Sequence, residues 1–351
     1  MTLGMTELDT FEAAFLGGDR KQALSVLSAL IQQAATASGT RDALLAALIP
    51  RLGHPHPGLR SYLALAGGAL IESGAPAREL AIALIEPVRR ALTEAGRMLT
   101  HFVELGADAG DGSIGVSREM LDAIAERDPV AVQAWASMDM WYRPAVAAWT
   151  RETGVLQDVQ RDAALRTALA ALGHTTETTH WLSLLIETPF AARFVILFPE
   201  LGTTEPVIVD GVNDLGQLCV LLSDLLRDPL AAIGAPAAPE PGLLDVMRGI
   251  GPQQTDLGWQ CGFHCYRREA LDPADGLPKD GKDTWRAPGG TGHHSLPPDF
   301  LPGTLTPTAD GTRTLVVVGP NAPGGMRFLR MIAGVRTFDK LRASVTRPDP
   351  G

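Results

Sequence analysis

The chain has 351 residues, of which 45% are hydrophobic, and a formal net charge of −10. This hydrophobic content suffices for a packed core and excludes a disordered chain, and the length favours two domains. The acidic balance argues against a general affinity for nucleic acid or an anionic membrane, since both need clustered Lys and Arg.

Cysteine usage and the absence of long apolar runs predict a cytoplasmic protein. The three cysteines, an odd number without framework spacing, fit a reducing compartment. The first residues carry early acids and no basic n-region, unlike a signal peptide. No apolar run reaches the roughly 18 residues that a membrane span needs. We therefore expect no membrane partner.

Residues 1–190 are predicted to form an all-helical domain. Asp19 is placed to cap a helix whose apolar residues recur near the 3.6-residue period. Further helices are expected from about Leu59 to Glu72 and from about Ala77 to Glu104. Pro87 is expected to kink the last of these or to split it in two.

The helical half offers two sets of candidate ligand contacts. Trp141 and Tyr142 belong to an aromatic helix whose large side chains mostly share a face. This pattern fits core packing, and it also fits an aromatic wall that faces a ligand. His54 and His56 lie in a proline-bearing loop that can present both imidazoles to one ligand, although histidines in surface loops commonly have no such role.

The hydrophobic period changes at about Arg193, and residues 191–351 are predicted to form a mixed α/β domain. Phe194–Phe198 and Val207–Val209 are expected to form a hairpin, followed by a helix within Val212–Leu226. Proline content predicts a linker at 229–242 and a long loop at 270–307. Further strands are expected at Leu243–Met247, Trp259–Tyr266 and Thr314–Val318.

These elements predict an α+β fold. An all-helical N-terminal half is expected to pack on a smaller mixed α/β C-terminal half with a short, mainly antiparallel sheet.

A cluster of cysteines and histidines in the second half suggests a zinc site. Two cysteines and two histidines are available from Cys261, His264, Cys265, His293 and His294. If Trp259–Tyr266 is one strand, however, alternation places His264 opposite the cysteines, and the cysteines are about 13 Å apart. That geometry argues against a shared ion, and the alternative is a pair of small buried side chains.

Motifs for catalysis are missing or incomplete. The turn Gly319–Gly325 follows a predicted strand, but its spacing matches neither a dinucleotide fingerprint nor a P-loop. No Gly-x-Ser-x-Gly elbow occurs. His174 and His180 are six residues apart, which does not match the four-residue spacing of zinc-protease helices. We therefore assign no catalytic residue and no cofactor.

Several segments together carry a resemblance that covers most of the chain. The chain resembles an uncharacterised family of actinobacterial and myxobacterial proteins through Gly53–Gly74, Trp141–Pro144, His180–Leu185, Gly211–Leu226, Trp259–Tyr266, Ala270–Pro273, His294, Pro297, Asp299 and Arg313–Pro320. It is also similar in style to the non-catalytic peptide-binding proteins of ribosomal-peptide pathways such as crocagin biosynthesis. These resemblances imply a place beside biosynthetic or conflict-type gene sets.

The resulting hypothesis is a non-catalytic, peptide-binding accessory protein of a ribosomal-peptide natural-product pathway. A precursor peptide, or a partner biosynthetic protein, is expected to bind in a groove between the halves, and assembly into a homodimer is left open. The expected peptide contacts are Trp141, Tyr142, Trp259, Tyr266, Trp285 and His294.

Two other functions remain open. One is a metal-dependent enzyme that uses His264, His293, His294 and a carboxylate such as Asp283 or Asp299. The other is an interaction scaffold built on the helical half.

The peptide-binding hypothesis has one further support. Exposed strand edges in the second half would suit a bound peptide without any catalytic residue.

Overall fold

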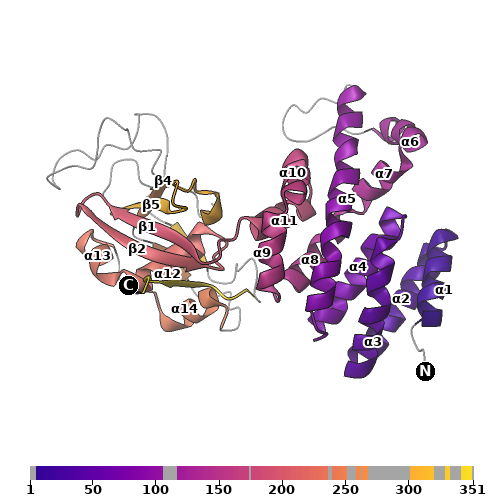
Figure 1. Cartoon of the computed structure of the whole chain (residues 1–351), viewed down its shortest axis with the longest axis horizontal. Helices are drawn as coiled ribbons and strands as arrows, with labels where there is room; N and C mark the ends of the chain where they lie inside the picture. The colour runs from indigo at the N-terminus through magenta and orange to yellow at the C-terminus, as the bar shows by residue number, and fades with distance from the viewer. Residues whose placement is uncertain are drawn as a thin grey trace. The chain divides into compact units, whose positions relative to one another are not determined.

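The computed structural model describes residues 5–105, 117–173, 175–235, 239–250, 258–261, 263–267, 301–319, 329–332 and 341–349. Its contacts divide the chain into two compact units, Met1–Ile186 and Glu187–Gly351. The fold is α+β, with an all-helical first unit and a second unit that combines helices with a small sheet (Figure 1). No helix among the described residues is long and apolar enough to span a bilayer.

The first unit is a succession of helices in which sequence neighbours commonly pack together, such as α1 with α2 and α2 with α3 (Figure 1). Its long-range packing joins α4 to α8, α5 to α7 and α10, and α8 to α11. Its α-helices are α1 (Met5–Leu16), α2 (Arg20–Ala35), α3 (Ser38–Leu48), α4 (Pro57–Glu72), α5 (Arg78–Glu104), α6 (Arg118–Arg127), α7 (Pro129–Ala136), α8 (Tyr142–Trp149), α9 (Thr153–Arg161), α10 (Ala163–Leu172) and α11 (Glu177–Ile186). Short 3₁₀ helices are η1 (Ile49–Gly53) and η2 (Met138–Met140).

Local sequence explains where these helices begin. Asp19 caps α2 by accepting a hydrogen bond from the Gln22 amide at 3.0 Å, as the sequence predicted. Helix α4 begins at Pro57, because proline suits the first helical position, where an amide donor is not needed. Helix α5 continues through Pro87 without splitting. Pro87 is buried there, so its packing in the core offsets the hydrogen bond that proline removes.

The second unit contains a five-stranded sheet in the order β4-β5-β1-β2-β7. The predicted hairpin is confirmed: β1 (Ala192–Phe198) pairs antiparallel with β2 (Thr203–Asp210). Strand β5 (Arg313–Val318) pairs parallel with β1, while β4 (His264–Arg267) and β7 (Ser344–Thr346) join antiparallel at the two sides. A separate two-stranded sheet pairs β3 (Gly258–Cys261) with β6 (Leu329–Ile332).

Helices α12 (Leu215–Leu225), α13 (Arg227–Ala232) and α14 (Pro241–Arg248) complete the described part of this unit, together with the 3₁₀ helix η5 (Pro302–Thr304). Helix α12 is the predicted helix within 212–226 and is buried along nearly its whole length. Its leucines share one hydrophobic core with Phe194 and Ile196 of β1 and with Leu315 and Val317 of β5. Burial of this apolar surface is the main force that holds helix and sheet together.

Two predicted strands are wrong. Leu243–Met247 lies in helix α14, which Pro241 opens and Gly249 closes in a left-handed conformation with φ 74°. The buried residues Leu243, Leu244, Val246 and Met247 fit a helical face as well as a strand. The segment Trp259–Tyr266 is not one strand, because β3 and β4 belong to different sheets.

Candidate functional site

Helix α8 is fixed by its buried face, which includes Pro144 of its first turn. Pro144 packs on Gly68 of α4, where an added Cβ would lie 2.8 Å from the Pro144 Cα. Trp149 is fully buried, and its indole Nε1 donates to the Ala81 carbonyl at 2.9 Å. Tyr142 is therefore half-buried and Arg143 exposed at the start of α8.

Helix α11 packs beside α8 and is fixed in the same way (Figure 1). The Thr178 hydroxyl donates to the Met138 carbonyl in the core, and Leu182 and Leu185 are fully buried. At the border of this buried face of α11, Trp181 is half-buried, and His180 is exposed. The helix thus presents an aromatic pair next to Tyr142.

Four planar side chains form a continuous row across the two helices, and we call Arg143, Tyr142, Trp181 and His180 the planar row. The Tyr142 and Trp181 rings are stacked, with centroids 5.9 Å apart and planes inclined by 14°. The Arg143 guanidinium lies 5.7 Å from the Tyr142 centroid. The His180 ring meets Trp181 edge-on at 5.8 Å. Such rows combine a large rigid apolar surface with a positive charge.

Arg143 is also hydrogen-bonded within the row. Its Nε donates to the Tyr142 hydroxyl at 3.1 Å, and this bond raises the pKa of Arg143 above its ordinary value. The bond fixes the guanidinium beside the ring. Because a guanidinium has five N–H donors, it retains donors for a carbonyl or carboxylate on a ligand.

The predicted peptide contacts are distributed unevenly in the structure. Trp141 is only 1% exposed, so it belongs to the core and offers no surface to a ligand. Tyr142 lies in the planar row. Trp259 and Tyr266 are on β3 and β4, in separate sheets. Trp285 and His294 lie outside the described residues.

The alternative metal site falls largely outside the described residues, which do not include His293, His294 or Asp283. His264 is on β4, opposite Val318. Among the described side chains, no group of three or more His, Cys, Asp or Glu is arranged to hold a metal ion. Cys261 and Cys265 lie in different strands, so their separation is not that of two residues in one continuous strand.

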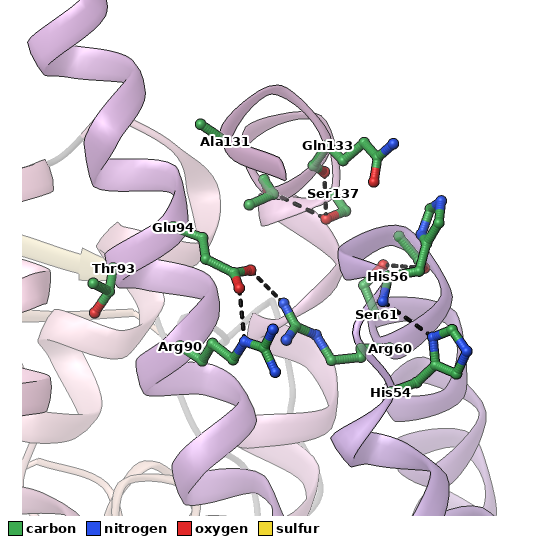
Figure 2. Close-up of polar contacts among 12 residues, drawn as sticks. His54, His56, Arg60, Ser61, Arg90, Thr93, Glu94, Ala131, Gln133 and Ser137 are labelled. Atoms are coloured by element: carbon green, nitrogen blue, oxygen red, sulfur yellow. Dashed lines mark hydrogen bonds and ion pairs between the residues drawn. The ribbon is translucent and has the colours of Figure 1, made fainter. Parts of the chain in front are cut away.

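The two loop histidines hold the backbone at the start of α4. His54 Nδ1 accepts from the His56 amide at 3.0 Å (Figure 2). His56 Nδ1 accepts from the Leu59 amide at 3.3 Å. A neutral imidazole that accepts at Nδ1 carries its proton on Nε2, so neither ring offers a free lone pair to a metal. Burial, followed by the charges of His54, Arg20 and Arg60, lowers the pKa of His56.

A buried ion pair lies nearby. Figure 2 shows the Glu94 carboxylate of α5 between the guanidinium groups of Arg60 and Arg90. Arg60 is fully buried and Glu94 is 6% exposed. Desolvation lowers the pKa of Arg60, and the Glu94 charge opposes this shift. The contact joins α4 to α5, and both Arg60 and Glu94 are buried in it.

The first amide of the glycine turn after β5 already has a hydrogen-bond partner. The Gly319 amide donates to the Glu200 carboxylate at 2.8 Å. A phosphate at this amide would have to displace a carboxylate of the same charge. This contact agrees with a structural turn, while the following residues 320–328 lie outside the described part.

Comparison with known proteins adds no further assignment: no family model matches the chain, and no curated protein or solved structure matches it either. The planar row is the one arrangement among the described side chains that combines exposure, stacked aromatic rings and a fixed charge. Sequence analysis identified Tyr142 but not Trp181, which follows an exposed histidine on a short helix.

Proposed function

We propose that the chain is a non-catalytic peptide-binding protein and that the planar row anchors the peptide. The observation that carries this proposal is the stacked pair of Tyr142 and Trp181, held half-exposed beside the Arg143 guanidinium. Tyrosine, tryptophan and arginine are the residues that contribute most to binding energy in protein interfaces.

The physical properties of the row define its ligand. An aromatic, proline or long aliphatic side chain can cover the rings and bury apolar surface on them. A carbonyl or carboxylate of the same peptide can accept a hydrogen bond from Arg143. Since the helices are held from the core side, the row needs little rearrangement on binding, which keeps its entropic cost low.

The biological role that fits such a site is that of an accessory protein in a ribosomal-peptide pathway. There it would hold a precursor peptide while other enzymes modify it. The support for this role is the resemblance in style between this chain and the peptide-binding proteins of those pathways. The ligand would then be a peptide encoded close to the gene for this chain.

A display selection tests the proposal without assuming any particular peptide sequence. A random peptide library is selected on the wild-type chain and, in parallel, on the Trp181→Ala variant. We expect wild-type selection to enrich peptides with an aromatic or proline residue near an acidic one, and the variant to lose them.

A matched variant controls for general effects of removing an indole. Trp135→Ala removes another half-buried tryptophan, one that contacts Phe102 edge-on at 5.7 Å. It should enrich the same peptides as the wild type. Identical enrichment on wild type and Trp181→Ala would refute the proposed site.

A further inference from the structure

Two buried cysteines of the second unit face each other across its core. Cys219 of α12 and Cys265 of β4 are each 3% exposed, and their Sγ atoms lie 3.7 Å apart. They are far apart in sequence, and the same core includes Leu218, Leu222 and Phe263. The fold alone brings these two sulfur atoms together.

The two sulfur atoms are in direct contact with no atom between them. To form an S–S bond they would have to approach to about 2.05 Å. Cys265 pairs with Val317 of β5. Among the described strands, β4 is the edge strand on this side of the five-stranded sheet. A short strand at the end of a sheet opens more readily than a central one, which gives a small oxidant access to both thiols.

We propose that Cys219 and Cys265 are an oxidation site at which a reversible disulfide joins β4 to α12. The oxidant is a low-molecular-weight disulfide of the glutathione class. One cysteine thiolate attacks a sulfur of the oxidant, the S–S bond of the oxidant breaks, and one small thiolate leaves.

The second cysteine thiolate then attacks the protein sulfur of the mixed disulfide. The bond between the two protein sulfurs forms, and the second small thiolate leaves. Two electrons pass from the protein to the oxidant, and the two cysteine protons end on the two released thiols. Excess small thiol reverses the reaction by the same exchange.

The disulfide has a structural consequence in the second unit. It closes a loop between residues that are 46 positions apart, which restricts the unfolded chain. It also ties a strand at the sheet end to a helix that is almost entirely buried. We therefore expect slower hydrogen exchange at the β4 amides and a melting temperature raised by on the order of 5–10 °C.

Peptide mapping tests the site directly. The full chain is reduced, freed of reductant and incubated in its folded state with oxidised glutathione, and remaining thiols are then alkylated in denaturant. We expect a mass loss of two hydrogens and a linked peptide that contains Cys219 and Cys265. The Cys261→Ser variant should give the same link, whereas Cys219→Ala and Cys265→Ala should not.

The wild-type and Cys261→Ser proteins keep the test decisive even if a core variant fails to fold. Full alkylation of Cys219 and Cys265 in the oxidised folded protein would overturn the proposal. So would a dominant link through Cys261, or a Cys219–Cys265 link that forms only after the chain is unfolded. If hydrogen exchange at the β4 amides is equally fast before and after oxidation, the disulfide does not hold β4 on α12.

Discussion

The two units differ in the charge of the polar side chains that they bury. Among the described residues, both buried side chains that carry a charge, Arg60 and Glu94, belong to the helical unit. In the second unit the buried Gln217 carries no charge: it accepts from the Asn213 amide at 3.0 Å and donates to the Met247 carbonyl at 2.6 Å. The Cys219 and Cys265 thiols lie among apolar side chains in the same unit.

This difference follows from how each unit satisfies its backbone. Helices complete their hydrogen bonds internally, so contacts between helices depend on side chains alone, and an ion pair can fix how α4 meets α5. A sheet bonds strand to strand, and the loops around it need side-chain amides to serve their peptide groups. The helical unit should therefore be the more sensitive of the two to loss of a single charge.

The largest expected effect is at the buried ion pair. Glu94→Gln leaves the Arg60 guanidinium buried without an opposite charge, which should lower the free energy of unfolding of the helical unit by about 3–5 kcal/mol. Urea denaturation followed by helical circular dichroism measures this loss. Glu72→Gln is the control, since Glu72 pairs with Arg151 at 2.9 Å on the surface and its side chain is 58% exposed.

The control variant should cost less than about 1 kcal/mol. Replacing both buried partners, as in Arg60→Met with Glu94→Leu, should recover much of the stability, because no unpaired charge remains. An unfolding free energy of Glu94→Gln within about 1 kcal/mol of wild type, the limit expected for surface pairs, would contradict the difference between the units.

A second test compares two helical glycines of the same unit. At Gly68 an added Cβ would lie 2.8 Å from the Pro144 backbone, so Gly68→Ala should push α8 from α4 and cost about 1–3 kcal/mol. At Gly96 the same Cβ meets nothing within 4 Å, so Gly96→Ala should stabilise α5 by about 0.5–1 kcal/mol. Thermal unfolding distinguishes the two signs, and a stabilising Gly68→Ala would show that the helices are not in close contact there.

The smallest expected effect is a pH dependence at His56. Its pKa is lowered in the folded state, chiefly by burial, so the unfolded chain binds the proton more readily. The stability it contributes is present above its unfolded pKa of about 6.5 and is lost as pH falls through the lower folded value. Protonation also removes the cap at Leu59, worth about 1 kcal/mol.

Substitution separates the cap from the titration. His56→Asn keeps a side-chain acceptor for the Leu59 amide but does not titrate. Its free energy of unfolding should therefore fall less between about pH 7 and 5 than that of wild type. His56→Ala should be less stable at about pH 7.5 as well. If wild type and His56→Asn show the same pH dependence in denaturant titrations, the cap is not the titrating element.

Sequence reasoning predicted elements whose signals are local. Asp19 as a cap, the hairpin of β1 and β2 and the strand β5 followed from capping residues and runs of apolar residues. Helix α14 was missed because four apolar residues in a short segment fit either period. Pro87 does not split α5, because tertiary packing overrides a local cost, and the predicted kink stays a prediction.

The candidate site was only partly predictable, because it depends on which face of each helix the core buries. Trp141 and Tyr142 are adjacent in sequence, yet one is in the core and the other is half-exposed. Trp181 comes to Tyr142 only through the packing of α8 on α11. The pairing of Cys219 with Cys265 likewise depends on the contact between α12 and β4, which no spacing rule predicts.

Calorimetric titration of the chain with a peptide selected on it tests the central claim most directly. With wild type and Trp135→Ala, the dissociation constants should agree within about threefold, less than the tenfold that about 1.4 kcal/mol represents. Trp181→Ala and Tyr142→Ala should each weaken binding at least about tenfold, since each removes an aromatic anchor. Equal affinity for wild type and the Trp181→Ala and Tyr142→Ala variants would show that the peptide does not bind on the planar row.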